Sequence, residues 1–183
     1  FANGVGVVNA QNGVYLKLLE SKVEVKVESQ IATIKTTQVF TNNLGSTKDV
    51  VFIFPLPESG SATNLRWKIS NQWKTAVFSA VPQDTSLGGG GSVHANLKTY
   101  MGNTPLIFSI PDAIRNDSLL TVELTYVQLL KYSFGNVLFS YPNKYLLIQT
   151  GVLNRQEFNF NLVSPRTIDS IFFLSHTPQS ITN

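Results

Sequence analysis

The hydrophobic stretch that ends in two prolines constrains the fold of this chain more than any other feature. Residues 50–54 form a continuous apolar run, and Pro55, Leu56 and Pro57 follow it directly. Proline has no backbone N–H to donate to a strand ladder, so it occurs at strand ends and at sheet edges. We therefore expect the strand to end there and the chain to leave its sheet in an extended conformation, with Leu56 closing the end of the core.

The residues that follow predict that the chain then joins a second sheet. Glu58 begins a short polar stretch, residues 58–61, whose composition is typical of a turn. Leu65, Trp67 and Ile69 then alternate with polar residues, so they share one face of a strand. A strand that ends at a corner and a strand that restarts after it indicate two stacked layers.

Alternation with a period of two continues along much of the chain. Apolar and charged residues alternate over residues 23–28, and the pattern returns over residues 32–40 after a tight turn at Ser29 and Gln30. Three further segments alternate in the same way: residues 120–126, 137–141 and 158–162. Two segments are apolar at both parities, which is typical of central strands covered on both faces: residues 50–54 and 170–176.

Helix signals are weak by comparison. The best candidate is one short helix near residues 94–101, ended by Gly102 as a C-cap. Roughly ten short strands separated by turns predict an all-β fold. We expect an antiparallel β-sandwich that forms a single domain over residues 1–183.

The composition limits the partners that such a domain can take. Charged residues make up 14% of the chain, and no run of Lys or Arg exceeds one residue, so no nucleic-acid-binding surface is predicted. No apolar run is long enough to cross a membrane, which predicts no membrane insertion. The surface must rely on neutral polar side chains, which favours an extracellular or cell-surface location. The absence of cysteine favours a bacterial source, and a first residue other than Met fits a removed leader or a fragment.

Around the corner, the chain resembles the VIT domain, named for vault-associated and inter-alpha-trypsin-inhibitor proteins. The resemblance extends from about residue 13 to about residue 141, and residues 142–183 resemble the strands that close such domains. The residues that carry it are Val39, Phe40, Asn42, Phe52, Phe54, Pro55, Leu56, Pro57, Glu58 and Tyr126. Residues 76–106 depart from the family pattern. Within this segment, only Tyr100 and Gly102 match it.

The resemblance implies a non-catalytic structural and protein-interaction domain of a larger protein, with no cofactor. It implies a scaffold beside an adhesive module such as a von Willebrand A domain, which this sequence does not contain. In this scheme the loop over residues 82–99 supplies a variable surface. The protein partner stays unidentified at this point.

The glycine run from Gly88 to Ser92 does not predict a phosphate site. A phosphate-binding loop needs a Gly-Lys-Ser/Thr and a helix directly after it, and neither follows here. The run is a flexible surface loop, either natural or engineered. Asp84 and Ser86, just before it, fit part of a von Willebrand A metal motif, but Pro82 and the glycines exclude the strand and helix that this motif requires. No metal site is therefore predicted.

The two histidines do not indicate a catalytic site. His94 and His176 lie far apart in the sequence and have no second histidine at ligand spacing. A hydrolase would need one of them beside Ser92, Ser175 or a carboxylate in a deep pocket, and no nucleophile-elbow motif is present. We expect no catalytic residues.

A carbohydrate-binding β-sandwich is the alternative function. Exposed aromatic side chains on a sandwich suit the faces of sugar rings, and six aromatic residues are candidates for such a platform: Trp67, Trp73, Tyr100, Tyr132, Tyr141 and Tyr145. Trp67 shares its parity with Leu65 and Ile69, so we expect it in the core. The parity pattern constrains Trp73 less.

Overall fold

The computed structural model describes residues 5–77, 105–145 and 151–182, and these residues form strands but no helix. The strands are β1 (Gly6–Asn9), β2 (Lys17–Glu28), β3 (Ile31–Thr41), β4 (Lys48–Pro55), β5 (Gly60–Ile69), β6 (Gln72–Thr75), β7 (Pro105–Ile114), β8 (Leu119–Leu129), β9 (Tyr132–Ser133), β10 (Asn136–Val137) and β11 (Arg155–Val163). The predicted all-β class is confirmed. The helix expected near residues 94–101 lies outside the described residues.

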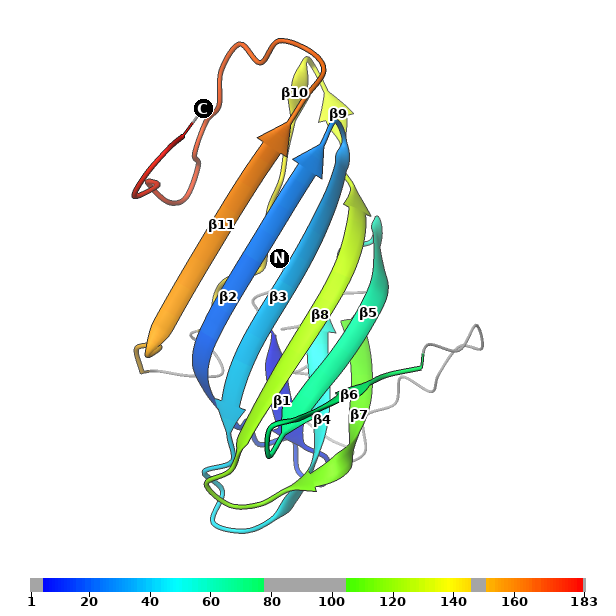
Figure 1. Ribbon diagram of the computed structural model, residues 1–183, viewed down its shortest axis with the longest axis vertical. Helices are drawn as coiled ribbons and strands as arrows, with labels where there is room; N and C mark the ends of the chain where they lie inside the picture. Colours follow the sequence, from blue (N-terminus) through cyan, green and yellow to red (C-terminus); the bar gives the residue numbers. More distant parts are fainter. Residues whose placement is uncertain (1–4, 78–104, 146–150, 183) are drawn as a thin grey trace.

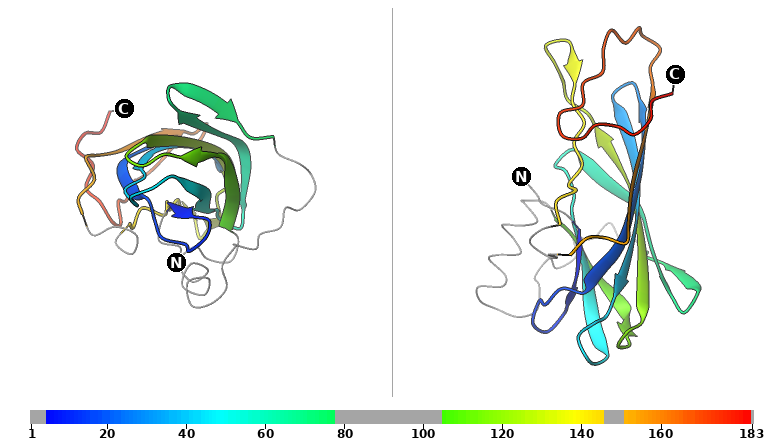
Figure 2. Two further views of the ribbon diagram at one scale, coloured as in Figure 1. Left: turned by 90° about the horizontal axis from the view of Figure 1, so that it is seen from below. Right: turned by 90° about the vertical axis from the view of Figure 1, so that its left-hand side faces the viewer.

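Two sheets stack to form a sandwich (Figure 1). The large sheet has six strands in the order β11-β2-β3-β8-β5-β6, and the small sheet has three in the order β1-β4-β7. Figure 2 shows that the large sheet curves around the small one. Pairing in both sheets is antiparallel except between β11 and β2, which run parallel. The period-two pattern is the same for parallel and antiparallel strands, so the sequence did not predict the parallel pairing of β11 and β2.

The segment Pro55, Leu56 and Pro57, here called the proline corner, joins the two sheets as predicted. β4 belongs to the small sheet and ends at Pro55, whereas β5 belongs to the large sheet and begins at Gly60. The turn between them is closed by a hydrogen bond of 2.8 Å from the Gly60 N–H to the Pro57 carbonyl. A Cβ at Gly60 would lie 3.0 Å from that carbonyl oxygen, so a larger residue would need the backbone at Pro57 to shift. Leu56 is partly buried against the core.

The predicted core faces are confirmed for the central strands. The inward residues of β8 are fully buried: Leu120, Val122, Leu124 and Tyr126. β4 is buried at both parities, because Phe52 and Phe54 face the main core while Val51 and Ile53 pack with Val8 on the other side of the small sheet. The β2–β3 hairpin turns at Ser29, which adopts a left-handed φ of 58°.

Two predicted strands are wrong or only partly formed. The strand expected over residues 137–141 stops at Val137, although Phe139 and Tyr141 still pack against the core. Residues 170–176 form no strand, and Phe172 and Leu174 are 75% and 83% exposed. A segment that is apolar at both parities is expected to pack against other residues on both faces. In the described part of the chain, no sheet packs against residues 170–176.

The edge position of β11 modifies the prediction for its phenylalanines. Phe158 and Phe160 point to the inner side, where their ring centroids lie 6.4 Å and 5.5 Å from that of Phe139. Both side chains nevertheless remain more than two-fifths exposed. β11 is the outermost strand of the large sheet, so only one side of each ring is covered.

Candidate functional site

Asn42 forms a buried polar lock at the end of β3. Its Nδ2 donates hydrogen bonds to the carbonyl oxygens of Ile114 (2.7 Å) and Ser46 (2.9 Å), and its Oδ1 accepts one from the Leu44 N–H (3.1 Å). Its own carbonyl accepts a bond from the Asp117 N–H. The side chain is fully buried. One asparagine thus satisfies backbone groups at the ends of β3 and β7, which belong to different sheets.

Six further residues that carry the VIT resemblance, those over residues 54–58 and Tyr126, lie at or near the corner. Phe54 and Tyr126 are fully buried, and their ring centroids lie 5.3 Å apart at a tilted angle. Pro55 ends β4, Pro57 accepts the bond that closes the turn, and Glu58 lies exposed in that turn. These residues pack or turn the chain, and they gather no reactive groups at one point.

A second polar cluster lies inside the sandwich, on the inner face of β2 and β3. The Gln38 Nε2 donates to the Tyr141 hydroxyl (3.4 Å), and the Thr36 hydroxyl donates to the Gln38 Oε1 (3.1 Å). The hydroxyls of Ser21 and Tyr145 form a bond of 3.0 Å. These contacts attach the chain segment after β10 to the large sheet.

Burial keeps the phenols of this cluster neutral. Desolvation raises the pKa of Tyr141 and of Tyr145, and it also raises the pKa of Tyr126. A phenol with a raised pKa is neither a nucleophile nor a general base near neutral pH. The cluster therefore fixes a covering segment and offers no acid–base pair.

Ion pairs cover the outer face of the large sheet, which Figure 1 shows uncovered by any strand. Glu123 of β8 is its most buried acid: Oε1 accepts a bond from the Arg66 Nε (2.6 Å), and Oε2 lies 3.2 Å from the Lys35 Nζ. Burial by itself raises the pKa of Glu123, but the hydrogen bonds and charges of the two cations outweigh it, and the pKa is lowered. Three neighbouring strands are joined through this carboxylate.

Stability should therefore depend on Glu123 in a pH-dependent way. A lowered folded pKa contributes stability above the unfolded value of about 4.3, and the contribution is lost as the pH falls through the folded pKa. We expect Glu123→Gln to lower the free energy of unfolding at neutral pH. The difference in this free energy between the wild type and the variant, here called the gap, should narrow below about pH 4. Urea unfolding of both proteins across this range measures the gap.

Glu28→Gln is the matched control for this prediction. Glu28 pairs with Lys26 at 2.7 Å, but both side chains are more than half exposed. Exposed pairs contribute little, so this variant should unfold like the wild type at neutral pH. A Glu123→Gln gap that stays constant from neutral to acidic pH would contradict the proposed role of the carboxylate.

Asp112 of β7 connects the small sheet to the β5–β6 hairpin. Its carboxylate accepts a bond of 2.8 Å from the Trp67 Nε1 and a second bond from the Lys74 Nζ. Trp67 and Lys74 are directly paired across β5 and β6. The hydrogen bond from Lys74, followed by that from Trp67, lowers the pKa of Asp112. This contact, here called the Asp112 clamp, holds the hairpin in a fixed orientation.

The structure does not bring the proposed sugar-platform aromatics together. Trp67 is 4% exposed, as its parity predicted, and Tyr141 and Tyr145 are turned into the core. Tyr132 lies on the separate β9–β10 hairpin. Tyr100 lies outside the described residues. Trp73, at 42% exposure on β6, is the aromatic of this set that remains on a sheet surface.

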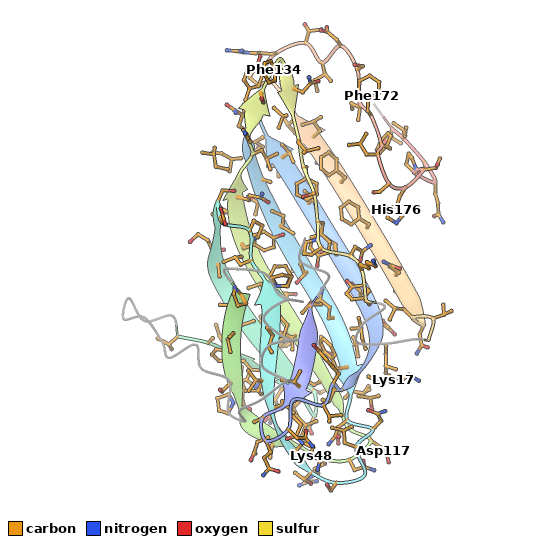
Figure 3. All side chains as sticks on the ribbon, turned by 180° about the vertical axis from the view of Figure 1, so that it is seen from behind. Lys17, Lys48, Asp117, Phe134, Phe172 and His176 are labelled. Atoms are coloured by element: carbon orange, nitrogen blue, oxygen red, sulfur yellow. The ribbon has the colours of Figure 1, made fainter. Side chains whose placement is uncertain are left out.

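The histidine and glycine-loop candidates form no site in the described part of the chain. The His176 Nδ1 lies 2.9 Å from the hydroxyl of its neighbour Ser175, and both residues are exposed (Figure 3). The loop over residues 82–99 lies outside the described residues, together with Asp84, Ser86, the Gly88–Ser92 run and His94. Among the residues described, no group of three or more His, Asp or Glu side chains could hold a metal ion. No described helix has the length and hydropathy to span a membrane.

Sequence reasoning missed the polar groups that join neighbouring strands or the two layers. Gln38 has the parity of the core residues Ile34 and Phe40, which was the available signal for its burial. Asp112 and Glu123 carried no such signal, because the partners of both acids come from strands distant in the sequence.

The comparisons with known proteins give one family and a weak structural likeness. Residues 18–80 match the family model of the vault protein inter-alpha-trypsin domain. No curated protein sequence matches the chain. Two crystal structures of a mutant M1 zinc metallopeptidase from Deinococcus radiodurans, one bound to a Tyr-Ser-Ala substrate, are 10% identical, with a TM-score of 0.38. Each match covers 68% of this chain and 24% of the peptidase chain, so this chain spans about a quarter of the length of that enzyme.

Proposed function

This chain carries a VIT domain, matched over residues 18–80, and from this premise we propose that it is a rigid protein-interaction scaffold within a larger extracellular or cell-surface protein. VIT domains are typically non-catalytic modules of larger proteins. The neighbour we propose is an adhesive module, such as a von Willebrand A domain, in the same parent chain. The sandwich would hold that module in a defined orientation.

The exposed apolar segment after β11 carries this proposal. Residues 168–174, here called the C-terminal apolar segment, expose five large apolar side chains: Ile168, Ile171, Phe172, Phe173 and Leu174. Single exposed apolar residues are ordinary on a protein surface, but a contiguous group of this size is typical of an interaction site. Neither the large nor the small sheet covers this segment.

The position of the segment suits contact with a neighbouring module. Figure 3 shows Phe172 toward the same end of the molecule as Phe134, whereas Lys48 and Asp117 lie at the opposite end. The segment follows β11, the edge strand whose Phe158 and Phe160 are also half-exposed. An edge strand next to exposed apolar residues offers both backbone hydrogen-bonding groups and apolar surface to a partner.

Three connections between the sheets support the proposed scaffold role. The proline corner, the Asn42 lock and the Asp112 clamp each connect parts of the two sheets. A partner held at one end would therefore be oriented by the whole sandwich.

The experiment uses the double variant Phe172→Ser, Leu174→Ser in this chain. The wild type and the variant are titrated against the polypeptide encoded directly downstream in the parent gene, and binding is followed by calorimetry. Because both side chains are exposed, we expect the variant to unfold at the same urea concentration as the wild type. We expect its affinity for the downstream polypeptide to fall about tenfold or more, since exposed aromatic and aliphatic anchors dominate such contacts.

Val152→Ser is the matched control, because Val152 is also almost fully exposed but precedes β11. It should bind like the wild type. Equal binding by the double variant and the wild type would overturn the proposal, as would a parent gene that encodes no further module.

A further inference from the structure

Trp73 forms an exposed aromatic surface beside two cations on the outer face of the large sheet. The Arg66 guanidinium lies 4.4 Å from the centroid of the Trp73 ring, and the Lys68 Nζ lies 5.4 Å from it. Lys68 and Trp73 are directly paired across β5 and β6, so their side chains project to the same face. This group, here called the Trp73 cluster, is separate from the C-terminal apolar segment, which follows β11 at the other edge of the sheet.

The hairpin that carries the cluster is held in place before any ligand arrives. The Asp112 clamp fixes Trp67 and Lys74, the inward neighbours of Lys68 and Trp73 on the same two strands. Arg66 is fixed through its Nε by the bond to Glu123. A surface whose side chains are already ordered loses little conformational entropy when it binds.

The cluster also combines positive charge with an aromatic ring that remains 42% exposed beside the two cations. Lys68 has no ion pair among the described residues. The planar guanidinium of Arg66 carries N–H donors beyond Nε, in a geometry that suits carboxylate and sulfate groups. The chain as a whole is basic, with a formal net charge of +3, which favours the approach of anions.

We propose that the Trp73 cluster is a binding site for acidic polysaccharides. A pyranose ring presents a face of C–H groups that complements the negative face of an indole ring. A carboxylate or sulfate on the same sugar would then lie beside Arg66 and Lys68. A flat ring and an anionic group on one rigid unit match the two parts of the cluster, whereas an acidic peptide side chain has the anion without the ring.

The test measures binding of a short oligogalacturonate and of a sulfated dextran oligosaccharide, which distinguish the carboxylate from the sulfate. Tryptophan fluorescence reports on the site, because Trp67 is buried and Trp73 is exposed. We expect at least one of the two to bind and shift the emission, and the affinity to fall as salt is added. Lys68→Ala, followed by fluorescence, and Trp73→Ala, followed by calorimetry because it lacks the reporter, should each weaken binding about tenfold, as expected for the loss of a charged or a stacking contact.

Two controls separate the cluster from general properties of the surface. Phe134→Ala removes a fully exposed aromatic on the β9–β10 hairpin, and Lys26→Ala removes a cation on the same outer face. Both variants should bind like the wild type. Since Lys68 is only partly buried and makes no ion pair among the described residues, Lys68→Ala tests the site even if Trp73→Ala disturbs the hairpin.

Four results would overturn the proposal. The first is no binding of either acidic oligosaccharide, and the second is equal binding by the wild type, Trp73→Ala and Lys68→Ala. The third is binding of polyglutamate or oligothymidylate that is as tight as binding of the acidic sugar, since this would show attraction to any polyanion. The fourth is equal binding of a neutral dextran of the same length, since this would contradict the role of the cations.

Discussion

Phe54→Ala is expected to lower the free energy of unfolding by about 3–5 kcal/mol, the usual cost of truncating a fully buried phenylalanine. Phe54 lies directly before the proline corner, and its ring contacts those of Tyr126 and Tyr141, with centroids 5.3 Å and 6.3 Å away. The alanine would leave a cavity between the two sheets, because the backbone on the carboxyl side is held by two prolines and cannot collapse into it. Urea unfolding followed by far-UV circular dichroism measures the loss.

Phe134→Ala is the matched control for this substitution. Phe134 is fully exposed on the β9–β10 hairpin, so its removal should change the free energy of unfolding by no more than about 0.5 kcal/mol. If Phe54→Ala unfolded at the same urea concentration as Phe134→Ala, the corner would not be the packed junction described above.

Asn42→Ala is expected to have the second largest effect, because its side chain makes three hydrogen bonds to backbone groups. The carbonyl of Ile114 would be left buried without its donor, and each group left in this state costs about 1–3 kcal/mol. With the bonds to Ser46 and Leu44 also lost, we expect a total of roughly 2–4 kcal/mol. Asn42→Asp would keep the acceptor for the Leu44 N–H but lose both donated bonds.

Asn43→Ala is the natural comparison, since Asn43 is the next residue and is exposed. Its unfolding midpoint should match that of the wild type. If Asn42→Ala and Asn43→Ala had the same unfolding midpoint, the buried amide of Asn42 would contribute no net stability. This result would contradict the prediction. Hydrogen exchange at Leu44 gives a local readout, because its amide donates to the Asn42 Oδ1 and should exchange faster in Asn42→Ala.

These two residues bear on function through the orientation of the sheets. The C-terminal apolar segment follows β11, at one edge of the large sheet, and the Trp73 cluster lies at the other edge, on β5 and β6. Phe54 and Asn42 both connect the large sheet to the small one. A variant that loosens this connection should weaken both proposed binding sites at once, whereas changes at either surface should weaken only one.

The sequence by itself determined the elements whose patterns are local. The alternation of β2, β3 and β8 and the prolines after Phe54 predicted strands, core faces and the passage from one sheet to the other, and the structure confirms them. The buried position of Trp67 was also predictable, because parity alone decides which face of a strand a residue occupies.

Only the tertiary structure decided which distant groups meet and which apolar runs are covered. Residues 170–176 have the composition of a central strand, yet they lie exposed, since burial requires neighbours that a local pattern does not provide. Likewise, the sequence made Trp73 one of six candidate sugar-binding aromatics, but only the structure places Arg66 and Lys68 of β5 against its ring. Strand order and direction set these contacts, and both arise from pairing between segments far apart in the chain.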